Sequence, residues 1–475
     1  MRRKDISVVI LSALALFWAA PTAAQTKPNV VLIVMDDVGY GDYGSYGAPD
    51  VKTPNIDRLA RDGVRFTDFY AAPTCTPTRA ALITGRHYQR TALEVPLGAA
   101  PAGGRGLEAT GRSLPQLMRN AGYATGLLGK WHLGYATNQI PKAHGFDYFF
   151  GFLSGLVDYY QHTDQTGKPD LFENDKPVQV DGYMTDLITE RAMSFIDRNA
   201  QQPFFLEVAY NAAHWPFQVP DKPSVAPGNA RLVQPHEDHT STRADYVAML
   251  ERADQGVGKI VDTLQKRGLT RNTLVIFTND NGGEWLSRNA PLFNRKQTIW
   301  EGGIRVPLIM KWPERIPSGR TSPQAGFIFD LTATILAAGG ATIPADAKFE
   351  GLNLLPIVGG QQPPLERTLF FRVTGNRAAR AVRQGDWKLM VDGPNTMLFN
   401  VRTDMAERND LAKDRLDIVR KLRPLITAWE EDVDAEAKSS ANYQAPAAAP
   451  AGGRGAGAPG GRGAAPGGGR GATAK

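Results

Sequence analysis

Polar side chains follow four apolar runs of the sequence, and their types suggest a shared site. The pairs are Asn29–Met35 before Asp36 and Asp37, Ala124–Leu128 before Lys130 and His132, Phe204–Ala209 before His214, and Leu274–Thr278 before Asp280 and Asn281. Ligands of open α/β sheets bind beyond the carboxyl ends of the strands. Each pattern alone is better explained by a turn or a structural histidine, but the four together predict one polar site at one sheet edge.

The acidic and amide residues of this set predict a site for a hard cation. Asp36, Asp37, Asp280 and Asn281 offer only oxygen ligands, which suit Ca²⁺ and not Zn²⁺. Three converging carboxylates would also repel one another without a cation. The basic residues of the same set supply the opposite charge. A divalent cation surrounded by basic side chains is suited to a substrate anion whose oxygens they share.

The only cysteine of the chain, Cys75, is a further candidate for chemistry. It begins the segment CTPTRAALITG, in which Pro77 can open a helix and Gly85 can end it. Cys75 is therefore expected at a helix N-terminus, where an anion is favoured. A reactive thiolate is an alternative, because that position lowers the pKa of a thiol. A cysteine hydrolase, however, would leave the oxygen ligands unexplained.

The elements that must position these residues alternate between strands and helices. Besides the four runs above, the candidates are a strand at Ile304–Met310 and helices at 53–63, Ser113–Ala121, Tyr183–Arg198 and Thr242–Arg267. Continuous apolar strands rich in β-branched residues are typical of a sheet that is buried on both faces. Residues 25–345 are thus predicted to form an α/β catalytic domain with a large, mostly parallel (mixed) central sheet flanked by helices.

A change of composition near Pro344–Pro364 precedes shorter candidate elements. These are strands at Thr368–Val373, Trp387–Val391 and Met397–Asn400 and a final helix at Asp414–Glu430. Residues 346–439 are accordingly predicted to form a smaller α+β domain, with a short antiparallel sheet and a helix.

The two ends of the chain differ from the body in composition and carry its net charge. Residues 1–24 have a basic start, an apolar run and small residues, which predict a cleaved export signal. The run, Ile6–Ala20, is shorter than the roughly 20 residues that span a bilayer, so no stable membrane insertion is expected. Residues 440–475, rich in Ala, Pro and Gly, predict a disordered tail. The ends hold the whole excess of 54 basic over 48 acidic residues, and the neutral body gives no reason to expect a nucleic-acid partner.

Several ordered motifs resemble those of the type I sulfatases, which belong to the alkaline phosphatase superfamily. CTPTR fits the family pattern Cys-x-Pro-x-Arg, with Thr78 where serine is commoner. The other matching segments are PNVVLIVMDDVGYGDYGSYG (28–47), TPNIDRLARDG (53–63), GKWHLG (129–134), HGFDYFFGF (144–152), NAAHWPF (211–217), TNDNGG (278–283) and KQTIWEGGIRVPLIMKWP (296–313). The resemblance covers residues 28–317 and implies an arylsulfatase-like sulfuric ester hydrolase.

The resemblance implies a modified cysteine and a metal ion. In this family a dedicated maturation enzyme oxidises the cysteine of the motif to formylglycine (3-oxoalanine), which is the fate implied for Cys75. One Ca²⁺, in preference to Mg²⁺, would be held by an oxygen of the modified residue 75 and by Asp36, Asp37, Asp280 and Asn281.

The resemblance also assigns roles to the basic residues. Arg79 and Lys130 would fix the hydrated formylglycine, and His132 would act on its second hydroxyl. His214 and Lys296 would hold the sulfate and help the alcohol to leave. A hydrated aldehyde has two hydroxyls on one carbon: one attacks sulfur, and deprotonation of the other re-forms the aldehyde and releases sulfate, which an ordinary serine or cysteine nucleophile could not do.

Other functions remain open from the sequence. Phosphonate monoesterases and phosphodiesterases of the same superfamily are the nearest alternative, although their second metal-binding pair tends to be Asp-His, whereas Asp280-Asn281 favours sulfate. An inactive binding protein would be expected to lack metal or anion residues, and none is missing. RNA binding would rest on residues 440–475 alone. We expect a secreted enzyme of the bacterial periplasm; its oligomeric state and the aryl, sugar or alkyl nature of its alcohol stay open.

Overall fold

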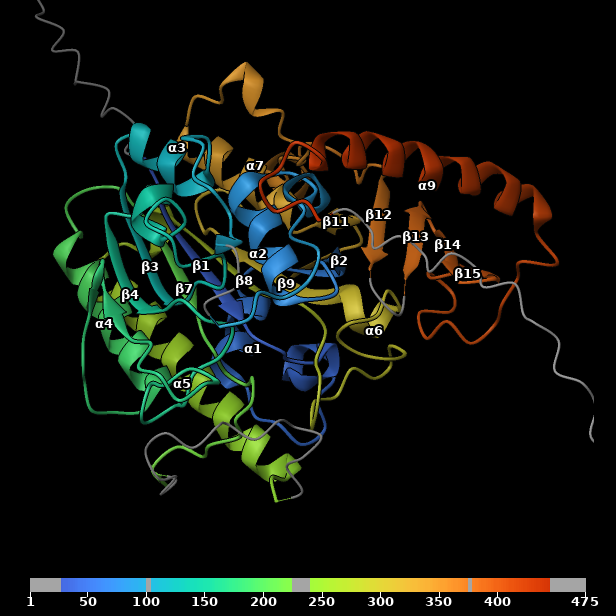
Figure 1. Cartoon of the computed structure of the whole chain (residues 1–475). Coiled ribbons are helices and arrows are strands. Elements are labelled where there is room, and N and C mark those ends of the chain that lie inside the picture. The colour runs from blue at the N-terminus through green and yellow to red at the C-terminus, as the bar shows by residue number, and fades with distance from the viewer. Residues whose placement is uncertain (1–26, 100–103, 224–239, 375–377, 445–475) are drawn as a thin grey trace, which may run out of the picture.

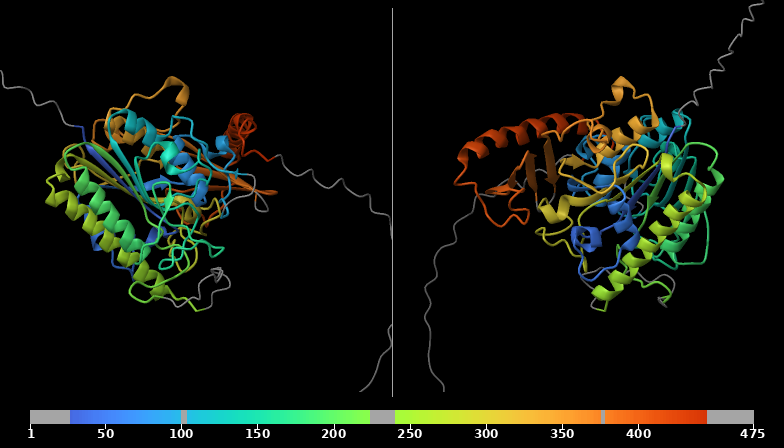
Figure 2. Two further views of the ribbon diagram at one scale, coloured as in Figure 1. Left: turned by 60° about the vertical axis from the view of Figure 1, so that its left-hand side comes forward. Right: turned by 180° about the vertical axis from the view of Figure 1, so that it is seen from behind.

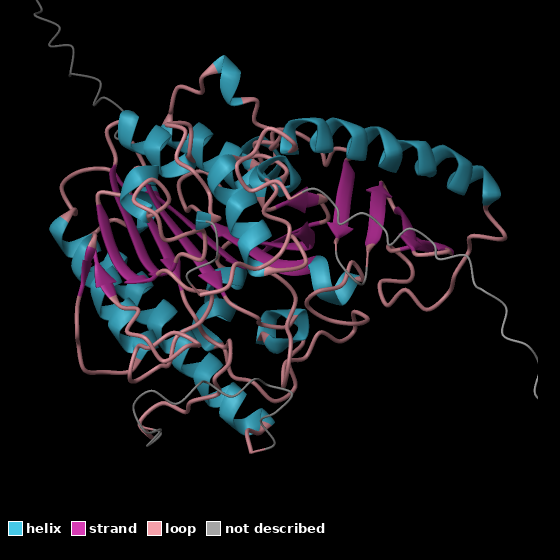
Figure 3. Ribbon diagram, viewed as in Figure 1, coloured by secondary structure: helices cyan, strands magenta, loops and turns pink. Residues whose placement is uncertain are grey.

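The computed structural model describes residues 27–99, 104–223, 240–374 and 378–444. In these ranges an 11-stranded sheet and a 4-stranded sheet lie side by side, with helices around them (Figures 1 and 3). The predicted export signal and residues 445–475 of the predicted tail lie outside the described residues.

The strands and helices have the following bounds. The large sheet contains β1 (Asn29–Met35), β2 (Val64–Tyr70), β3 (Ala124–Lys130), β4 (Tyr148–Phe152), β5 (Phe172–Glu173), β6 (Lys176–Pro177), β7 (Phe204–Ala209), β8 (Thr273–Asn279), β9 (Arg305–Lys311), β10 (Arg320–Ser322) and β11 (Gly326–Phe327). The small sheet contains β12 (Thr368–Val373), β13 (Ala379–Gln384), β14 (Trp387–Asp392) and β15 (Asn395–Asn400). The helices are α1 (Pro54–Arg61), α2 (Cys75–Thr84), α3 (Leu114–Asn120), α4 (Met184–Arg198), α5 (Arg243–Lys266), α6 (Glu301–Ile304), α7 (Phe329–Gly339), α8 (Leu355–Val358) and α9 (Leu416–Ala437).

The large sheet is mixed, as predicted. Its order is β10-β2-β9-β8-β1-β7-β3-β4-β5-β6, and β11 also pairs with β2. The centre, β8-β1-β7-β3-β4, is parallel. β9 runs antiparallel to both of its neighbours, β8 and β2. The chain enters β9 at Arg305 directly from the short helix α6.

Helices cover both faces of the large sheet. In β1, Val30, Leu32 and Val34 face the helices α2, α3 and α7, while Val31 and Ile33 face α1, α4 and α5. The turned view in Figure 2 shows α4 and α5, in green, along one face of the sheet, and the group of α2, α3 and α7 on the opposite face. Both faces of β1 are therefore dry, which explains why its sequence shows no alternation of apolar and polar residues.

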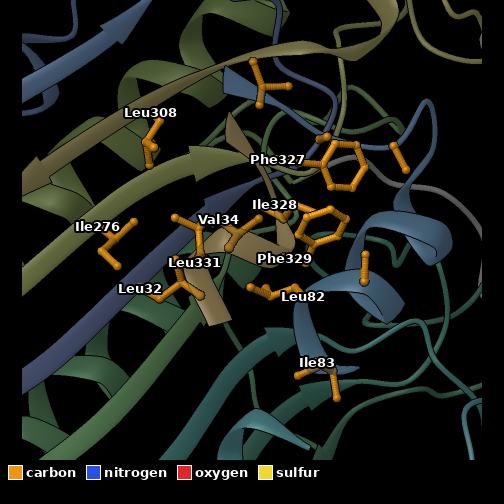
Figure 4. Packing of buried hydrophobic residues seen from close by; sticks show 14 of the residues in the cluster. Leu32, Val34, Leu82, Ile83, Ile276, Leu308, Phe327, Ile328, Phe329 and Leu331 are labelled. Atoms are coloured by element: carbon orange, nitrogen blue, oxygen red, sulfur yellow. The ribbon is translucent and has the colours of Figure 1, made fainter. Parts of the chain in front are cut away.

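The core on the α2 side brings together strands and helices that are distant in sequence (Figure 4). Leu32, Ile276 and Leu308 of three adjacent strands point toward Leu82 of α2 and Leu331 of α7, and all are at most 1% exposed. This packing holds α2, and therefore its first residue, Cys75, in a set place over the sheet.

The small sheet is antiparallel and buries both of its faces. Its side chains Phe371, Ala381 and Met390 join the core on the α2 side, whereas Val382 and Leu389 pack against α9. The buried residues of α9 recur at helical spacing as Ile418, Leu422, Ile426, Trp429, Val433 and Ala437. The predicted antiparallel sheet plus helix is confirmed, and α9 extends seven residues past the expected end because its apolar stripe continues.

Three details differ from the expectations or extend them. The elements not expected include β2, β4, β5, β6, β10, β11, β13, α7 and α8; in β2 and β13, charged residues break the apolar pattern. The tail was predicted to begin at residue 440, but Asn442 is 7% exposed and packs against the catalytic body. It accepts a hydrogen bond from the N–H of Gly106 at 3.0 Å and donates one to the carbonyl of Gly106 at 2.9 Å. Among the described residues, no helix combines the length and apolar character needed to cross a membrane.

Candidate active site

The four polar strand ends meet because β8, β1, β7 and β3 are adjacent and parallel. The backbone N–H of Asp36 donates to the carbonyl of Ala212, at 3.1 Å, and that of Asp280 donates to Met35, at 3.0 Å. These bonds continue the sheet pattern past the strands and draw the following loops together. The side chains of Asp36, Asp280 and Asn281 are completely buried.

Helix α2 begins at Cys75, as predicted, and ends at Gly85, which has a left-handed backbone with φ of 66°. Cys75 is 2% exposed. In the same first turn, Thr76 Oγ1 donates to the carbonyl of His132, at 3.0 Å. The helix N-terminus is thereby tied to the segment that follows β3, so that Cys75 and the strand-end residues share one site.

Three buried ion pairs link the acidic and basic members of the predicted site. Lys130 Nζ lies 2.6 Å from Asp36 Oδ2, and Lys296 Nζ lies 2.7 Å from Asp37 Oδ2. Arg79 donates to Asp280 Oδ2 at 3.0 Å and to the backbone carbonyl of Lys130 at 3.1 Å. Three carboxylates are thus matched by three cationic side chains, and a further divalent cation would leave the site positively charged.

Asp37 is the hub of the site, and burial and its neighbours pull its pKa in opposite directions. Its Oδ1 accepts from Asn281 Nδ2 at 2.7 Å, and His214 Nε2 lies 3.4 Å from its Oδ2. Burial raises the pKa of Asp37, but the ammonium of Lys296 outweighs that effect and holds the pKa well below its usual value. Asp37 therefore stays a carboxylate at neutral pH.

The pKa of Asp36 is shifted in the opposite direction. Burial and the neighbouring carboxylate of Asp280 raise the pKa of Asp36 well above its usual value, despite the ammonium of Lys130. Burial also raises the pKa of the Cys75 thiol. An unmodified Cys75 is therefore a neutral thiol at neutral pH, which argues against the thiolate alternative.

Two oxygens of the site have no protein partner. Within the described part of the chain, Asp36 Oδ1 and Asn281 Oδ1 are buried without a hydrogen bond, a costly arrangement unless something else binds them. Ligand atoms of Asp36, Cys75 and Asp280 lie within 4.8 Å of one another. These spare oxygens and the carboxylates around them have the chemistry of a site for a hard cation.

The two histidines of the site are neutral and held by backbone carbonyls. His132 Nε2 bonds to the carbonyl of Leu97 at 2.8 Å, and His214 Nδ1 to that of Trp215 at 2.6 Å. Because a carbonyl only accepts, the bonded nitrogens carry the protons, and His132 Nδ1 and His214 Nε2 are the free bases. Burial lowers the pKa of His214 to about 3 and that of His132 well below its usual value.

The sequence did not predict a place at this site for three nearby residues. Glu284 Oε2 lies 3.7 Å from Lys296 Nζ, and its place just after TNDNGG was the only available signal. Glu207 of β7 is buried, and burial raises its pKa to about 7 although Arg79 opposes this; no local pattern marks it. The hydroxyl of Tyr159 donates to the carbonyls of Asn211 and His214 at 2.6 and 2.9 Å, and so supports the His214 loop.

Comparison with known protein families identifies the fold and its chemistry. Residues 28–341 match the family described as sulfatase, and residues 291–430 match the family described as N-sulphoglucosamine sulphohydrolase, C-terminal.

The chain belongs to the sulfatase family.

Individual sulfatases match over most of their length. N-acetylgalactosamine-6-sulfatase of Canis lupus familiaris is 36% identical over 394 residues, which are 77% of this chain and 71% of that protein. Human arylsulfatase G is 30% identical over 488 residues, covering 88% of this chain and 89% of that protein. The crystal structure of Ps i-CgsB superposes with a TM-score of 0.79 at 31% identity, covering 87% of this chain and 95% of that one.

This sulfatase is therefore a sulfuric ester hydrolase of type I in the alkaline phosphatase superfamily, as the motifs predicted. Its small C-terminal sheet and helix belong to the same architecture, because the second family match runs from the Lys296 segment into α9.

Proposed function

We propose that this sulfatase hydrolyses sulfate monoesters with a formylglycine made from Cys75 and a Ca²⁺ held by Asp36, Asp37, Asp280 and Asn281. The observation that carries the proposal is the convergence of these oxygen ligands on the N-terminus of α2, with two buried oxygens left unbonded.

The donor set fits a calcium ion. All four side chains offer oxygen ligands, which a hard cation prefers. Cys75 and His214 lie beside them, but one neutral thiol and one imidazole do not make the set of thiolates and imidazoles that zinc prefers. When bound, Ca²⁺ would supply a positive charge that orients the reacting oxygens and stabilises the charge that develops in the transition state. Arg79 and Lys130 pair with Asp280 and Asp36 and so hold these two carboxylates in place.

The modified residue 75 would supply the nucleophile. The hydrated aldehyde offers one hydroxyl to attack sulfur and a second whose deprotonation releases the sulfate. His132 is suited to take that proton, because its Nδ1 is unprotonated, is buried and, among the described residues, has no hydrogen-bond partner. Lys130 and Arg79, on the adjacent β3 and α2, would fix the hydrate.

His214 and Lys296 would hold the sulfate group and assist the leaving alcohol. Lys296 provides a permanent positive charge, since burial opposes that charge but Asp37 outweighs it and raises the pKa of Lys296 well above its usual value. His214 is neutral without substrate, and the negative charge of a sulfate ester would favour its protonation. A protonated His214 could then donate to the leaving oxygen.

We propose a sulfated carbohydrate as the substrate class. One relative is named N-acetylgalactosamine-6-sulfatase, and a second structure of Ps i-CgsB is a complex with k-i-k-neocarrahexaose. The test is turnover on a panel of one aryl sulfate, sulfated mono- and oligosaccharides, an alkyl sulfate, a phosphonate ester and a phosphodiester. The highest kcat/KM is expected for a sulfated sugar; a phosphonate ester cleaved faster than every sulfate would overturn the assignment.

Export remains part of the proposal and is supported by residues 1–24 alone. Modification of Cys75 requires a formylglycine-generating maturation enzyme as a partner. Because Cys75 is buried in the folded chain, we expect modification to precede folding.

Calcium is expected to stabilise the folded sulfatase. A ligand that binds only the folded state at a hundredfold excess over its Kd adds about 2.7 kcal/mol to the free energy of unfolding, which raises the melting temperature by a few degrees. Calorimetry after chelation and after addition of Ca²⁺ or Mg²⁺ checks this. An equal or larger rise with Mg²⁺ would contradict the preference for Ca²⁺, and no rise with either ion would contradict the metal site.

A further inference from the structure

Glu301, the first residue of α6, is buried at the boundary between the catalytic body and the small sheet. Its side chain is 0% exposed. Oε1 lies 2.8 Å from Lys388 Nζ of β14, and Oε2 accepts from Tyr70 of β2 at 2.7 Å and from Arg305 of β9 at 3.1 Å. One carboxylate thus joins α6 to strands of both sheets, and it lies five residues after Lys296.

Glu407, which follows β15, also binds the start of α6. Its Oε2 accepts the backbone N–H of Glu301 at 2.6 Å, and its Oε1 lies 2.8 Å from Lys388 Nζ. Lys388 is 0% exposed and Glu407 is 5% exposed. The segment 386–407 therefore holds both the backbone and the side chain of Glu301.

The two glycines that follow Glu301 support the segment that carries Lys296. Gly302 donates to the carbonyl of Phe293 at 2.8 Å. A Cβ on Gly302 would lie 2.4 Å from the carbonyl oxygen of Asn294, and one on Gly303 would lie 2.6 Å from that of Arg295. Residues 293–298 thus rest on α6 without space for a side chain, so a shift of α6 would move them.

Lys296 depends on this backbone for its position. A lysine has a flexible four-carbon stem and a compact charge, so its ammonium is held in place only if both its backbone and its partner are held. Its partner is Asp37, at 2.7 Å. Its backbone N–H donates to Gly283 at 3.1 Å, and the next residue, Gln297, donates to Pro73, at 2.8 Å. The same short segment therefore touches the loops before Cys75 and after Asn281.

The buried ion pairs around Glu301 favour a role for this residue in positioning α6. Arg305 and Lys388 surround Glu301, and Arg383 of β13 donates to Asp68 at 2.7 Å, next to Tyr70. Buried ion pairs add little net stability compared with apolar packing. They do, however, demand one geometry, because a displaced charge would be left unpaired.

We propose that Glu301, clamped by Lys388 and Glu407, is a positioning residue for Lys296, so that the small C-terminal sheet sets the place of the sulfate-binding ammonium. This inference rests on the proposed function through the role of Lys296. The segment 386–407 then contributes to catalysis without touching substrate.

A double-mutant cycle in the full-length, matured, calcium-loaded enzyme tests the proposal. Glu301→Gln keeps the size of the side chain and removes its charge, and it is measured with and without Lys296→Ala. A misplacement of about 1 Å can cost ~100-fold, so Glu301→Gln is expected to lower kcat/KM on a sulfate ester ~10-fold or more. In the Lys296→Ala background the loss should shrink to within about twofold. Equal losses in both backgrounds would overturn the proposal.

Hydrogen exchange provides a readout that does not depend on activity. Amides of residues 293–300 are expected to exchange ~10-fold faster in Glu301→Gln than in the wild type, because α6 no longer supports them; unchanged exchange would overturn the proposal. Should Glu301→Gln fail to fold, Glu407→Gln is expected to act in the same direction. A wild type that cleaves no sulfate ester would refute the proposed function, while the exchange measurement would still decide whether Glu301 holds the segment.

Glu94→Gln is the matched control. Glu94 pairs with Arg372 of β12, at 2.7 and 2.8 Å, and also bridges the body and the small sheet. Within the described ranges, no hydrogen bond or ion pair joins either residue to α6. It is expected to leave exchange at residues 293–300 unchanged within about twofold. If Glu94→Gln accelerated that exchange as much as Glu301→Gln, general loosening of the small sheet would explain the effect and the proposal would be wrong.

Discussion

Replacing Cys75 by alanine is expected to abolish turnover, by at least ~10⁴-fold, while the protein stays folded. The alanine removes the atom from which the nucleophile is made, and nucleophile replacements in other hydrolases cost roughly 10⁶-fold in kcat. Cys75 is buried at the start of α2 and forms no disulfide, so alanine leaves only a small cavity. Turnover and circular dichroism of the same preparation measure the two effects.

The chemical state of residue 75 can be read directly by mass spectrometry. In protein made with a maturation partner, the tryptic peptide that contains residue 75 should have lost sulfur and two hydrogens and gained one oxygen. Thr78→Ser, which introduces the residue commoner in the family, should be modified to the same extent. A fully active preparation in which residue 75 is still cysteine would falsify the formylglycine mechanism.

Replacing Asp280 by alanine is expected to lower kcat by ~10³-fold or more and to remove calcium binding. The change deletes a proposed metal ligand and leaves Arg79, its partner at 3.0 Å, buried without its carboxylate. Removal of one partner of a buried pair destabilises by roughly 3 kcal/mol, so assays belong well below the melting temperature. Calcium titration by calorimetry and steady-state kinetics test the two expectations.

Two further variants separate loss of the metal from loss of stability. Asp280→Asn retains one oxygen ligand and the shape of the side chain, and is expected to keep weak calcium binding. Asp254→Ala removes a buried carboxylate that accepts from the backbone of Ile56 at 2.9 Å, far from the site in the fold; it should destabilise the protein but leave calcium binding and turnover near the wild-type values. An Asp280→Ala enzyme with near wild-type turnover would exclude Asp280 from the metal site.

Local sequence patterns were sufficient to predict the elements that position the site. Asn29–Met35 is apolar at every position after Asn29, which requires burial on both faces, and the structure has β1 at those residues. Thr242–Arg267 was predicted as a helix, and α5 spans Arg243–Lys266. These predictions succeed because periodicity and terminal residues are properties of the segment itself. The strands β2 and β13 were not predicted, because their burial depends on partner strands elsewhere in the chain.

The convergence of the site could be predicted for the strand ends but not for its side-chain pairing. Parallel neighbours end at the same edge of a sheet, so Asp36 and Asp280 had to be close. Nothing local, however, shows that Lys296 would pair with Asp37 rather than Asp36, or that Glu284 would approach it. Such pairs are formed by loops whose course depends on the whole fold.

The sequence by itself determined the type of fold, the residue at the start of α2 and the oxygen-rich strand ends, because each depends on a pattern within a contiguous stretch of residues. Only the tertiary structure decided which cation neutralises which carboxylate, and that Lys388 holds Glu301 across 87 residues of sequence. The physical reason is that a buried charge is stable only beside a partner that the rest of the chain brings to it. No local pattern of residues can specify a partner that distant in the chain.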